Sequence, residues 1–430
     1  MKIIIDKYID ENFDWLKNNL KLLIREKSIN IPPKGLEDNA QKIIENIFIS
    51  LGLNIDKFSP DNVKDFKDSE AYLKGRDYNN RHNIIGYIGD DRGKILIFNG
   101  HIDTVPSNEF NWRKTKPFSP LIEGNKMYGL GSGDMKGGLI TTIFALKSII
   151  DLGIKIKGKV IIQSVVDEEF GGGNGTISCI KMGYVGDFAI IPEPTFMDLE
   201  ISNISSEVLI FNIKGDEGIN YIEKNKEAIN PIIVCGELIT ILREFENYLN
   251  SLKKEYNLYK DIKKPINFLF SDINAGENRI DKVITNPSLC TLRVYLMNYP
   301  EKSKEEFENQ LMNFIKKYPN IYKYFEDSHI EYFTLNRFIE GMNFNLNTDE
   351  NKKFIEIIQN NSREVLNKPL NKSAFLSGSD AFAFPKFGKT NAILLGPGGG
   401  NFHAADEFVY LDDLKNLSKI FARLIFDLCC

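Results

Sequence analysis

The sequence predicts an α/β fold in which a mostly parallel sheet is flanked by helices and is interrupted by an inserted, smaller α+β domain. From about residue 94 onward, short β-rich apolar runs each end at a polar or acidic cluster. These runs are KILIF before NGHID, KVIIQSVV before DEE, FAII before PEPT, and NAILL before GPGGG. Residues 135–150 have helical spacing and lie between the first two runs. This strand, helix, strand order is typical of parallel sheets.

The remaining elements follow in chain order. Residues 11–27 and 40–51 place apolar side chains at helical spacing and predict two surface helices, whereas 56–82 is polar and predicts a surface excursion. After residue 204 the pattern changes to β-α-β-β-α. The runs that make this pattern are VLIFNI, 227–256, INFLF, LCTLRVYLM and EKSKEEFENQLMNFIKK. We therefore expect a catalytic domain in two parts, 1–204 and 326–430, around an insert at 205–325, with a further helix at 349–366.

Composition excludes several classes of function. The chain has 430 residues and 54 Lys+Arg against 59 Asp+Glu, a net charge of −5. No block of basic residues could neutralise a row of phosphates, so we expect no nucleic-acid partner. Five cysteines form no CxxC pair, which indicates a reducing compartment, by default the cytoplasm. No apolar run predicts a signal peptide or a membrane span.

Histidines and carboxylates gather where the predicted strands end. His101 in NGHID and His403 in GGGNFHAADE both occupy glycine-flanked loops. Asp134, Glu168, Glu169 and Glu193 follow neighbouring elements, so their charges would repel unless cations lie between them. Two histidines with several carboxylates and no cysteine suit zinc, cobalt or manganese, and this many acidic groups favours a two-metal site with one bridging carboxylate. Asp103, two residues after His101, can orient its ring.

These motifs carry a family resemblance. The set GHIDTVP, YGLGSGDMKGG, DEEFGGG, PEPT and GPGG…HAADEFV resembles the dizinc amidohydrolases that include acetylornithine deacetylase, succinyl-diaminopimelate desuccinylase and carboxypeptidase G. The stretch GRDYNNRHNIIGYIG is similar to the acetylornithine deacetylase-like branch. The resemblance covers about residues 80–200 and 375–415.

The resemblance implies a role for each site residue. His101 and Glu193 would hold one metal ion, Glu169 and His403 the other, and Asp134 would bridge the two. Asp103 would orient His101, and Glu168 would be the general base. The peptide bond after Asp134 would be cis, and the insert would act as a lid through which two subunits form a homodimer.

Two positions depart from the family pattern. The family's lid usually supplies a histidine that stabilises the oxyanion, but here the segment reads KGDEGINYIEKNKEAINP, where Asn220 or Tyr221 is the nearest candidate. Phe382 stands where related enzymes often place an arginine that binds a substrate carboxylate. We therefore expect an altered substrate range, in which acetylornithine is a poor substrate.

The leading hypothesis is a metal-dependent hydrolase that cleaves an amide bond of a small N-acylated amine or amino acid. A di- or tripeptidase of the same family is the first alternative. The second, from another class, is a metal-binding protein whose catalysis is impaired because the lid histidine is absent. The presence of Glu168 speaks against it, since a protein without turnover needs no base beside its metal ions.

Overall fold

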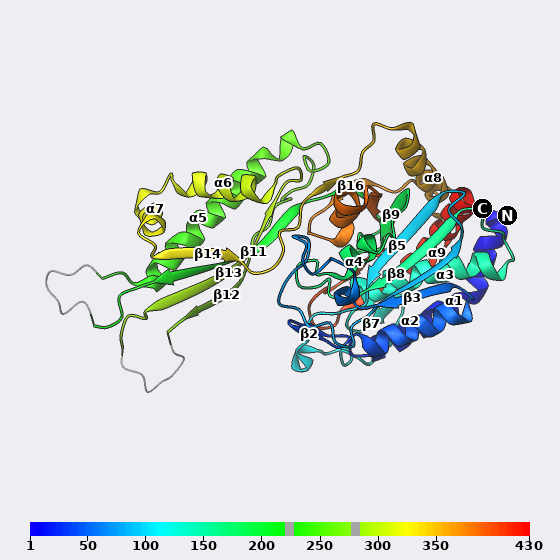
Figure 1. Cartoon of the computed structure of the whole chain (residues 1–430), viewed down its shortest axis with the longest axis horizontal. Helices are drawn as coiled ribbons and strands as arrows, with labels where there is room; N and C mark the ends of the chain where they lie inside the picture. The colour runs from blue at the N-terminus through cyan, green and yellow to red at the C-terminus, as the bar shows by residue number, and fades with distance from the viewer. Residues whose placement is uncertain (220–227, 277–283) are drawn as a thin grey trace. The chain divides into compact units, whose positions relative to one another are not determined.

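The computed structural model describes residues 1–219, 228–276 and 284–430, shown in Figure 1. They form two compact units. The first consists of Met1–Ser202, Asn343–Phe375 and Ser379–Cys430, and the second of Asn203–Met342 and Leu376–Gly378. The second unit begins close to the expected residue 205 but continues past 325. It does so because strand β14 (Ile330–Thr334) pairs with β11 (Ser205–Lys214), so both strands belong to one sheet.

The first unit is built on a mixed sheet, which has nine strands in the described part of the chain. Their order is β15-β10-β17-β9-β5-β8-β4-β3, with β16 beside β10. The bounds are β3 Asn54–Phe58, β4 Asn83–Gly89, β5 Ile95–His101, β8 Lys159–Val165, β9 Phe188–Ile191, β10 Leu199–Asn203, β15 Met342–Asn343, β16 Lys372–Phe375 and β17 Asn391–Leu394. The four central strands, β17, β9, β5 and β8, are parallel. They are the four runs predicted as parallel strands, and that prediction is confirmed.

The outer strands differ from the expectation. β4 is antiparallel to β8, β3 is antiparallel to β4, and β10 is antiparallel to β17. The start of the stretch 56–82, which we expected at the surface, lies within β3. This edge strand has mostly exposed or half-buried side chains, so its sequence lacks the apolar run that identified the central strands.

Helices cover both faces of this sheet. They are α1 Lys2–Arg25, α2 Asp38–Ser50, α3 Gly137–Asp151, α4 Gly175–Lys181, α8 Asp349–Leu366 and α9 Leu411–Cys429. On one face the Phe98 ring lies 5.2 Å from the ring of Phe421 in α9. On the other, Asn99 Nδ2 donates to Thr176 Oγ1 in α4 at 3.0 Å. Because successive strand residues point to opposite faces, α9 and α4 lie on opposite sides of β5.

A smaller sheet brings two distant motifs together. Its order is β18-β19-β7-β6, with bounds β6 Leu121–Glu123, β7 Lys126–Tyr128, β18 Gly399–Gly400 and β19 Phe408–Tyr410. β19 pairs with β7, so HAADEF lies beside the turn that contains Asp134. A separate two-stranded ribbon consists of β1 Asn30–Ile31 and β2 Lys34–Gly35.

The second unit is an antiparallel sheet in the order β12-β13-β11-β14. Its remaining bounds are β12 Leu269–Ala275, β13 Leu289–Asn298, α5 Pro231–Ser251, α6 Lys304–Ile315 and α7 Pro319–Glu326. Phe245 of α5 packs against Phe314 of α6 and against Phe268, the residue just before β12. The predicted β-α-β-β-α order is present, and the short elements α7 and β14 complete it.

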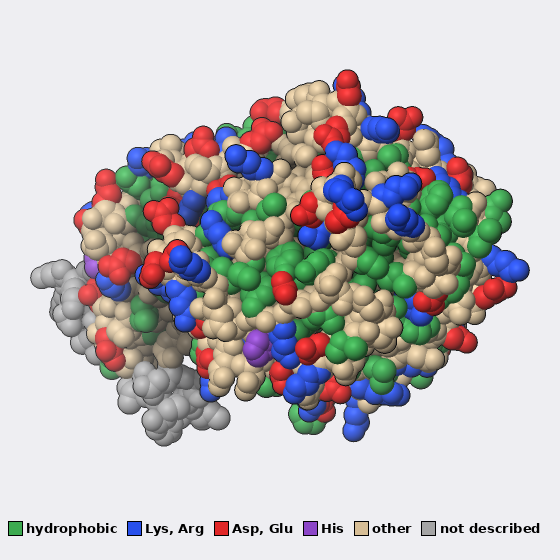
Figure 2. Space-filling model, turned by 45° about the vertical axis from the view of Figure 1, so that its right-hand side comes forward, with side chains coloured by type: hydrophobic (Ala, Val, Ile, Leu, Met, Phe, Trp, Pro, Cys, Tyr) green, Lys and Arg blue, Asp and Glu red, His purple; other side chains and the backbone are tan. Residues whose placement is uncertain are grey.

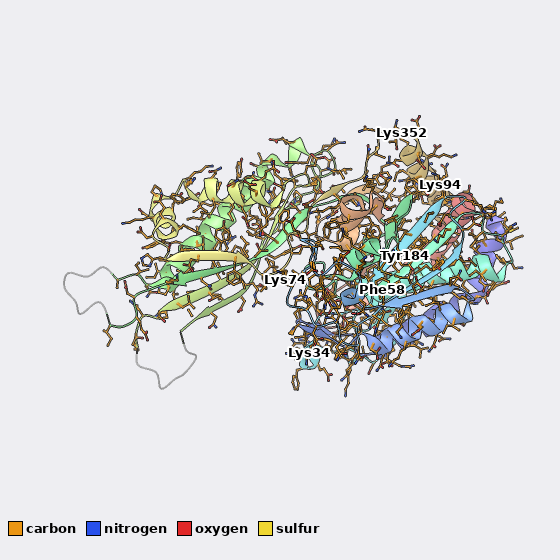
Figure 3. The ribbon with its side chains drawn as sticks, in the orientation of Figure 1. Lys34, Phe58, Lys74, Lys94, Tyr184 and Lys352 are labelled. Carbon is orange, nitrogen blue, oxygen red and sulfur yellow. The ribbon has the colours of Figure 1, made fainter. Side chains whose placement is uncertain are left out.

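Charged side chains of both signs lie on the surface, and several of them form ion pairs. Lys94, labelled in Figure 3, lies just before β5. It binds Asp187 at 2.9 Å and also contacts Glu350 in the first turn of α8. On the face shown in Figure 2, basic and acidic side chains are interspersed. None of the helices in the described residues has both the length and the apolar character needed to cross a membrane.

Two glycines allow α3 and the segment after β17 to approach the segment that follows β9. A Cβ added to Gly138 would lie 2.0 Å from the carbonyl oxygen of Pro192, and one added to Gly396 would lie 1.9 Å from that of Glu193. Either methyl group would displace backbone, which has little room to move because the surrounding strands are buried.

We predict that Gly138→Ala lowers the free energy of unfolding by about 1–3 kcal/mol, as overpacking a buried site does. Gly236→Ala is the matched control, because a Cβ at this helical position of α5 meets no atom within 4 Å. That change should leave stability unchanged or raise it by up to about 1 kcal/mol. Denaturant unfolding of both variants checks this, and a Gly138→Ala protein as stable as the parent would contradict the packing argument.

Candidate metal centre

The carboxyl ends of the parallel strands meet at one edge of the sheet and carry most of the residues singled out from the sequence. His101 is the last residue of β5 and lies opposite Val165 of β8, so the loop with Glu168 and Glu169 begins beside it. Glu193 follows β9 directly. The loop after β17 leads to His403, and Asp134 lies in the turn before α3.

Asp134 lies between the two histidines. Its Oδ1 is 3.1 Å from His101 Nε2, and its Oδ2 is 3.2 Å from His403 Nε2. The two carboxylate oxygens therefore face two different imidazoles. The peptide bond between Asp134 and Met135 is cis, as the family resemblance implies.

The three glutamates surround these groups. Glu169 Oε2 is 2.8 Å from His403 Nε2, whereas Glu168 Oε2 and Glu193 Oε1 are each 3.9 Å from His101 Nε2. Two sets of residues offer ligand atoms that all lie within 4.8 Å of one another. They are His101, Glu168 and Glu193 in one set, and His101, Asp134 and Glu169 in the other. This donor set of imidazoles and carboxylates fits one or more divalent cations.

The charges of the cluster are unbalanced. Burial raises the pKa of Glu168 and Glu193 well above the usual range, and neighbouring carboxylates raise both further. Burial also raises the pKa of Glu169. The negative charge of Glu169 in turn raises the pKa of His403 to about 12. The protein alone thus provides too little positive charge for these carboxyl groups to be ionised together, and cations would supply it.

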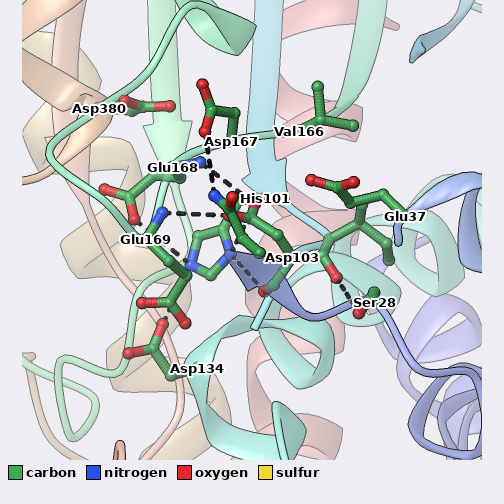
Figure 4. A network of polar contacts seen from close by, with 12 residues as sticks. Ser28, Glu37, His101, Asp103, Asp134, Val166, Asp167, Glu168, Glu169 and Asp380 are labelled. Carbon is green, nitrogen blue, oxygen red and sulfur yellow. Dashed lines mark hydrogen bonds and ion pairs between the residues drawn. The ribbon is translucent and has the colours of Figure 1, made fainter. Parts of the chain in front are cut away.

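The orientation of the His101 ring is fixed through Nδ1, the ring nitrogen that faces away from Asp134. Its buried Nδ1 lies 3.0 Å from the backbone oxygen of Asp103 and 3.6 Å from the Oδ1 of the same residue. A proton assigned to Nδ1 is donated to that oxygen, so Nε2, which faces Asp134, is the ring atom that would bind a metal ion. The Asp103 carboxylate also accepts the backbone N–H groups of Glu168 and Glu169, at 3.2 and 3.1 Å (Figure 4). Asp103 thereby fixes the histidine through its backbone oxygen and the glutamate loop through its carboxylate.

Sequence reasoning missed Glu407, although it lies within the quoted HAADEFV motif. Its carboxylate, 1% exposed, accepts the backbone N–H groups of Gly131, Gly133 and Asp134 at 2.8, 2.9 and 3.1 Å. Burial raises the pKa of Glu407 to about 8, although these N–H groups lower it. Glu407 thus fixes the turn that presents Asp134. The sequence could not indicate this role, because the partners of Glu407 are backbone N–H groups, which every residue except proline has.

A second group of residues that we missed lies behind the glutamate loop. Asp167, fully buried, accepts hydrogen bonds from Tyr78 and Arg76 and lies 3.4 Å from Arg81 Nη2. Arg81 in turn forms a buried ion pair with Glu37. Three of these residues, Arg76, Tyr78 and Arg81, come from the GRDYNNR stretch, which from the sequence alone indicated only the family resemblance. In the structure it holds the loop that carries Glu168 and Glu169.

Asn220 and Phe382 were the two residues expected from the sequence to contact the substrate. Asn220 lies outside the described residues. The Phe382 ring is 2% exposed and lies edge-on to Phe387, so in this structure it belongs to the core of the first unit. Asp380, two residues before Phe382, lies near Glu168 (Figure 4). It accepts a hydrogen bond from Thr176.

Comparison with known proteins shows which family combines these motifs. The model of Peptidase family M20/M25/M40 matches residues 97–427. The chain belongs to this family. Its members include metallopeptidases and amidohydrolases, so the chain is an enzyme of the hydrolase class.

Relatives of this M20-family chain differ in what they act on. It is 28% identical to acetylornithine deacetylase of Buchnera aphidicola over 81% of this chain and 84% of the relative. It is 32% identical to N-formyl-4-amino-5-aminomethyl-2-methylpyrimidine deformylase of Bacillus subtilis, over 46% of this chain and only 42% of that protein.

Solved structures share the fold of the M20-family chain at low identity. A dipeptidase of Saccharomyces cerevisiae matches 99% of this chain and 98% of its own, with a TM-score of 0.75 at 13% identity. A dinuclear metal-binding peptidase of Bacillus subtilis matches 96% and 98%, with a TM-score of 0.57 at 13% identity. At these identities the structures establish the fold alone.

We predict that Glu407→Gln weakens metal binding about 10-fold, because the new amide cannot accept all three backbone N–H groups and the Asp134 turn loosens. Competition with a chelator measures the affinity. Glu246→Gln is the control, since Glu246 is also buried and accepts a backbone N–H, from Phe268 at 2.6 Å, in the second unit. Equal metal affinity in the Glu407→Gln and parent proteins would contradict this role.

Proposed function

We propose that the protein is a two-metal hydrolase that cleaves an amide bond in a small N-acylated amine or amino acid. The observation that carries the proposal is the position of Asp134, whose two oxygens face two histidines. Each histidine has a glutamate beside it, Glu193 near His101 and Glu169 near His403. A carboxylate with one oxygen directed to each side is what a bridging ligand requires.

The residues fit a pair of divalent ions. His101 and Glu193 would hold one ion, Glu169 and His403 the other, and Asp134 would contact both. Zinc suits this donor set, with cobalt and manganese as the alternatives. Bound ions would supply positive charge that makes a water molecule more acidic and polarises the carbonyl group of the substrate.

Glu168 is the proposed general base. Its side chain lies in the same cluster, with Oε2 3.9 Å from His101 Nε2, and an ionised carboxylate there can accept a proton. In this role it takes a proton from the attacking water and later delivers a proton to the leaving nitrogen. Glu168 and Glu193 lie at the same distance from His101 Nε2, so a separate experiment must distinguish base from ligand.

The substrate enters from the side of His403. The His403 side chain is 51% exposed, whereas His101 is buried, so the cluster is open to solvent on that side. A panel of N-acyl amino acids, neutral N-acyl amines and short peptides tests the substrate class. Preference for the peptides would favour the peptidase alternative. We also propose that the chain forms a homodimer through its second unit, as the family resemblance implies, which sedimentation measurements can test.

The first prediction from this proposal concerns metal content. After reconstitution with zinc, cobalt or manganese, the purified protein should hold up to two ions per chain by elemental analysis. His403→Ala should reduce this to at most one tightly bound ion, because only one of the two sites uses His403. Only trace metal in the reconstituted parent would overturn the proposal.

The second prediction separates base from ligand. Glu168→Gln should keep the bound metal yet lose more than about 100-fold in kcat, because the amide keeps the shape of the side chain but cannot take the proton. Glu169→Gln is the comparison and should lose metal affinity, as expected of a ligand. If Glu168→Gln turns over near the parent rate, the base assignment is wrong.

A further inference from the structure

We infer that Asn30 is a positioning residue for the metal centre, which acts through the Asp103 carboxylate. The inference rests on the proposed two-metal function and extends it to a residue that no motif identifies. Asn30 is fully buried in β1 and comes from a segment of the chain far from the other site residues.

The side chain of Asn30 uses both of its polar atoms. Its Nδ2 donates to Asp103 Oδ2 at 2.9 Å and to Asp167 Oδ1 at 3.0 Å. Its Oδ1 accepts from Arg81 Nη2 at 3.2 Å. The guanidinium group can only donate, so it fixes which end of the amide is oxygen. Both amide hydrogens then face the two aspartates.

This arrangement limits how the Asp103 carboxylate can turn. Asp103 Oδ1 accepts the N–H of Glu168, and Oδ2 accepts both the N–H of Glu169 and the Asn30 amide. Of these three donors to the Asp103 carboxylate, two are backbone N–H groups of the glutamate loop. The third, the Asn30 amide, is a side chain from outside that loop. Without it, Asp103 and the loop could shift together, which would move the His101 contact and the Glu168 backbone at once. Groups that orient metal ligands in this way typically contribute 10–100-fold to metal affinity or activity.

The backbone around Asn30 is held independently of its side chain. Asn30 N donates to Thr104 O at 2.9 Å, and Thr104 N donates to Ser28 O at 3.0 Å. Arg81 Nε donates to Glu37 Oε2 at 2.9 Å, which holds the guanidinium group in place. Removing the Asn30 amide should therefore leave the strand and the guanidinium in place and affect mainly the two aspartates.

The test compares three variants of the full chain. Asn30→Ala removes the donor, and Asn30→Asp keeps the shape but turns a carboxylate oxygen toward Asp103 and Asp167. Asn361→Ala is the control, because Asn361 is equally buried in the same unit, donates to Asp427 at 2.9 Å and accepts from Lys2 at 2.9 Å. Cobalt and zinc affinities are measured by chelator competition, and thermal unfolding is followed without metal.

We expect both Asn30 variants to bind metal about 10–100-fold more weakly, with Asn30→Asp at least as weak as Asn30→Ala. At saturating metal, kcat should fall while KM stays within about twofold, because Asn30 does not touch substrate. Asn361→Ala should lower stability but leave metal affinity and kcat unchanged. Parent-like metal affinity in Asn30→Ala, or in Asn30→Asp if the alanine variant does not fold, overturns the inference and leaves the proposed function standing. An equal loss in Asn361→Ala also overturns it. A parent protein without metal overturns both.

Discussion

The structure depends on keeping several like charges close together in one buried place. Asp134, Glu168, Glu169 and Glu193 converge on a cluster that contains only two histidines from the described residues. Two unit charges 4 Å apart repel by about 4 kcal/mol at an effective dielectric constant of 20. The cluster is therefore costly for the protein alone and becomes favourable when cations bind. Metal binding and the stability of this edge of the sheet are linked for that reason.

The rest of the first unit provides a rigid frame for this arrangement. The central strands are buried along nearly their whole length, so their carboxyl ends are fixed in position. Two further carboxylates do not face the cluster but accept backbone N–H groups from the loops that do, Asp103 for the glutamate loop and Glu407 for the Asp134 turn. A carboxylate can accept several N–H groups at once, which makes it well suited to fix a loop.

The sequence predicted those strands and site residues that a single continuous segment of the chain identifies by its side chains. The four central strands were recognised because fully buried strands are continuous apolar runs. His101 and the acidic residues were recognised because they follow those runs directly. Asn30 and Glu407 could not be found in this way, because their partners are backbone groups or lie far along the chain. The strand β14 was missed because its alternating exposure gives only a short, weak pattern.

Under the proposed function, the chemistry of the site and the choice of substrate depend on different residues. Every predicted metal ligand, together with Asp103 and Glu168, belongs to the first unit. Relatives of the same family are named as a deacetylase and a deformylase, and both names describe removal of an acyl group from nitrogen. A shared metal centre can serve each of these because it acts on the carbonyl carbon and the leaving nitrogen, which all such substrates have in common. Selectivity must therefore come from groups around the cluster.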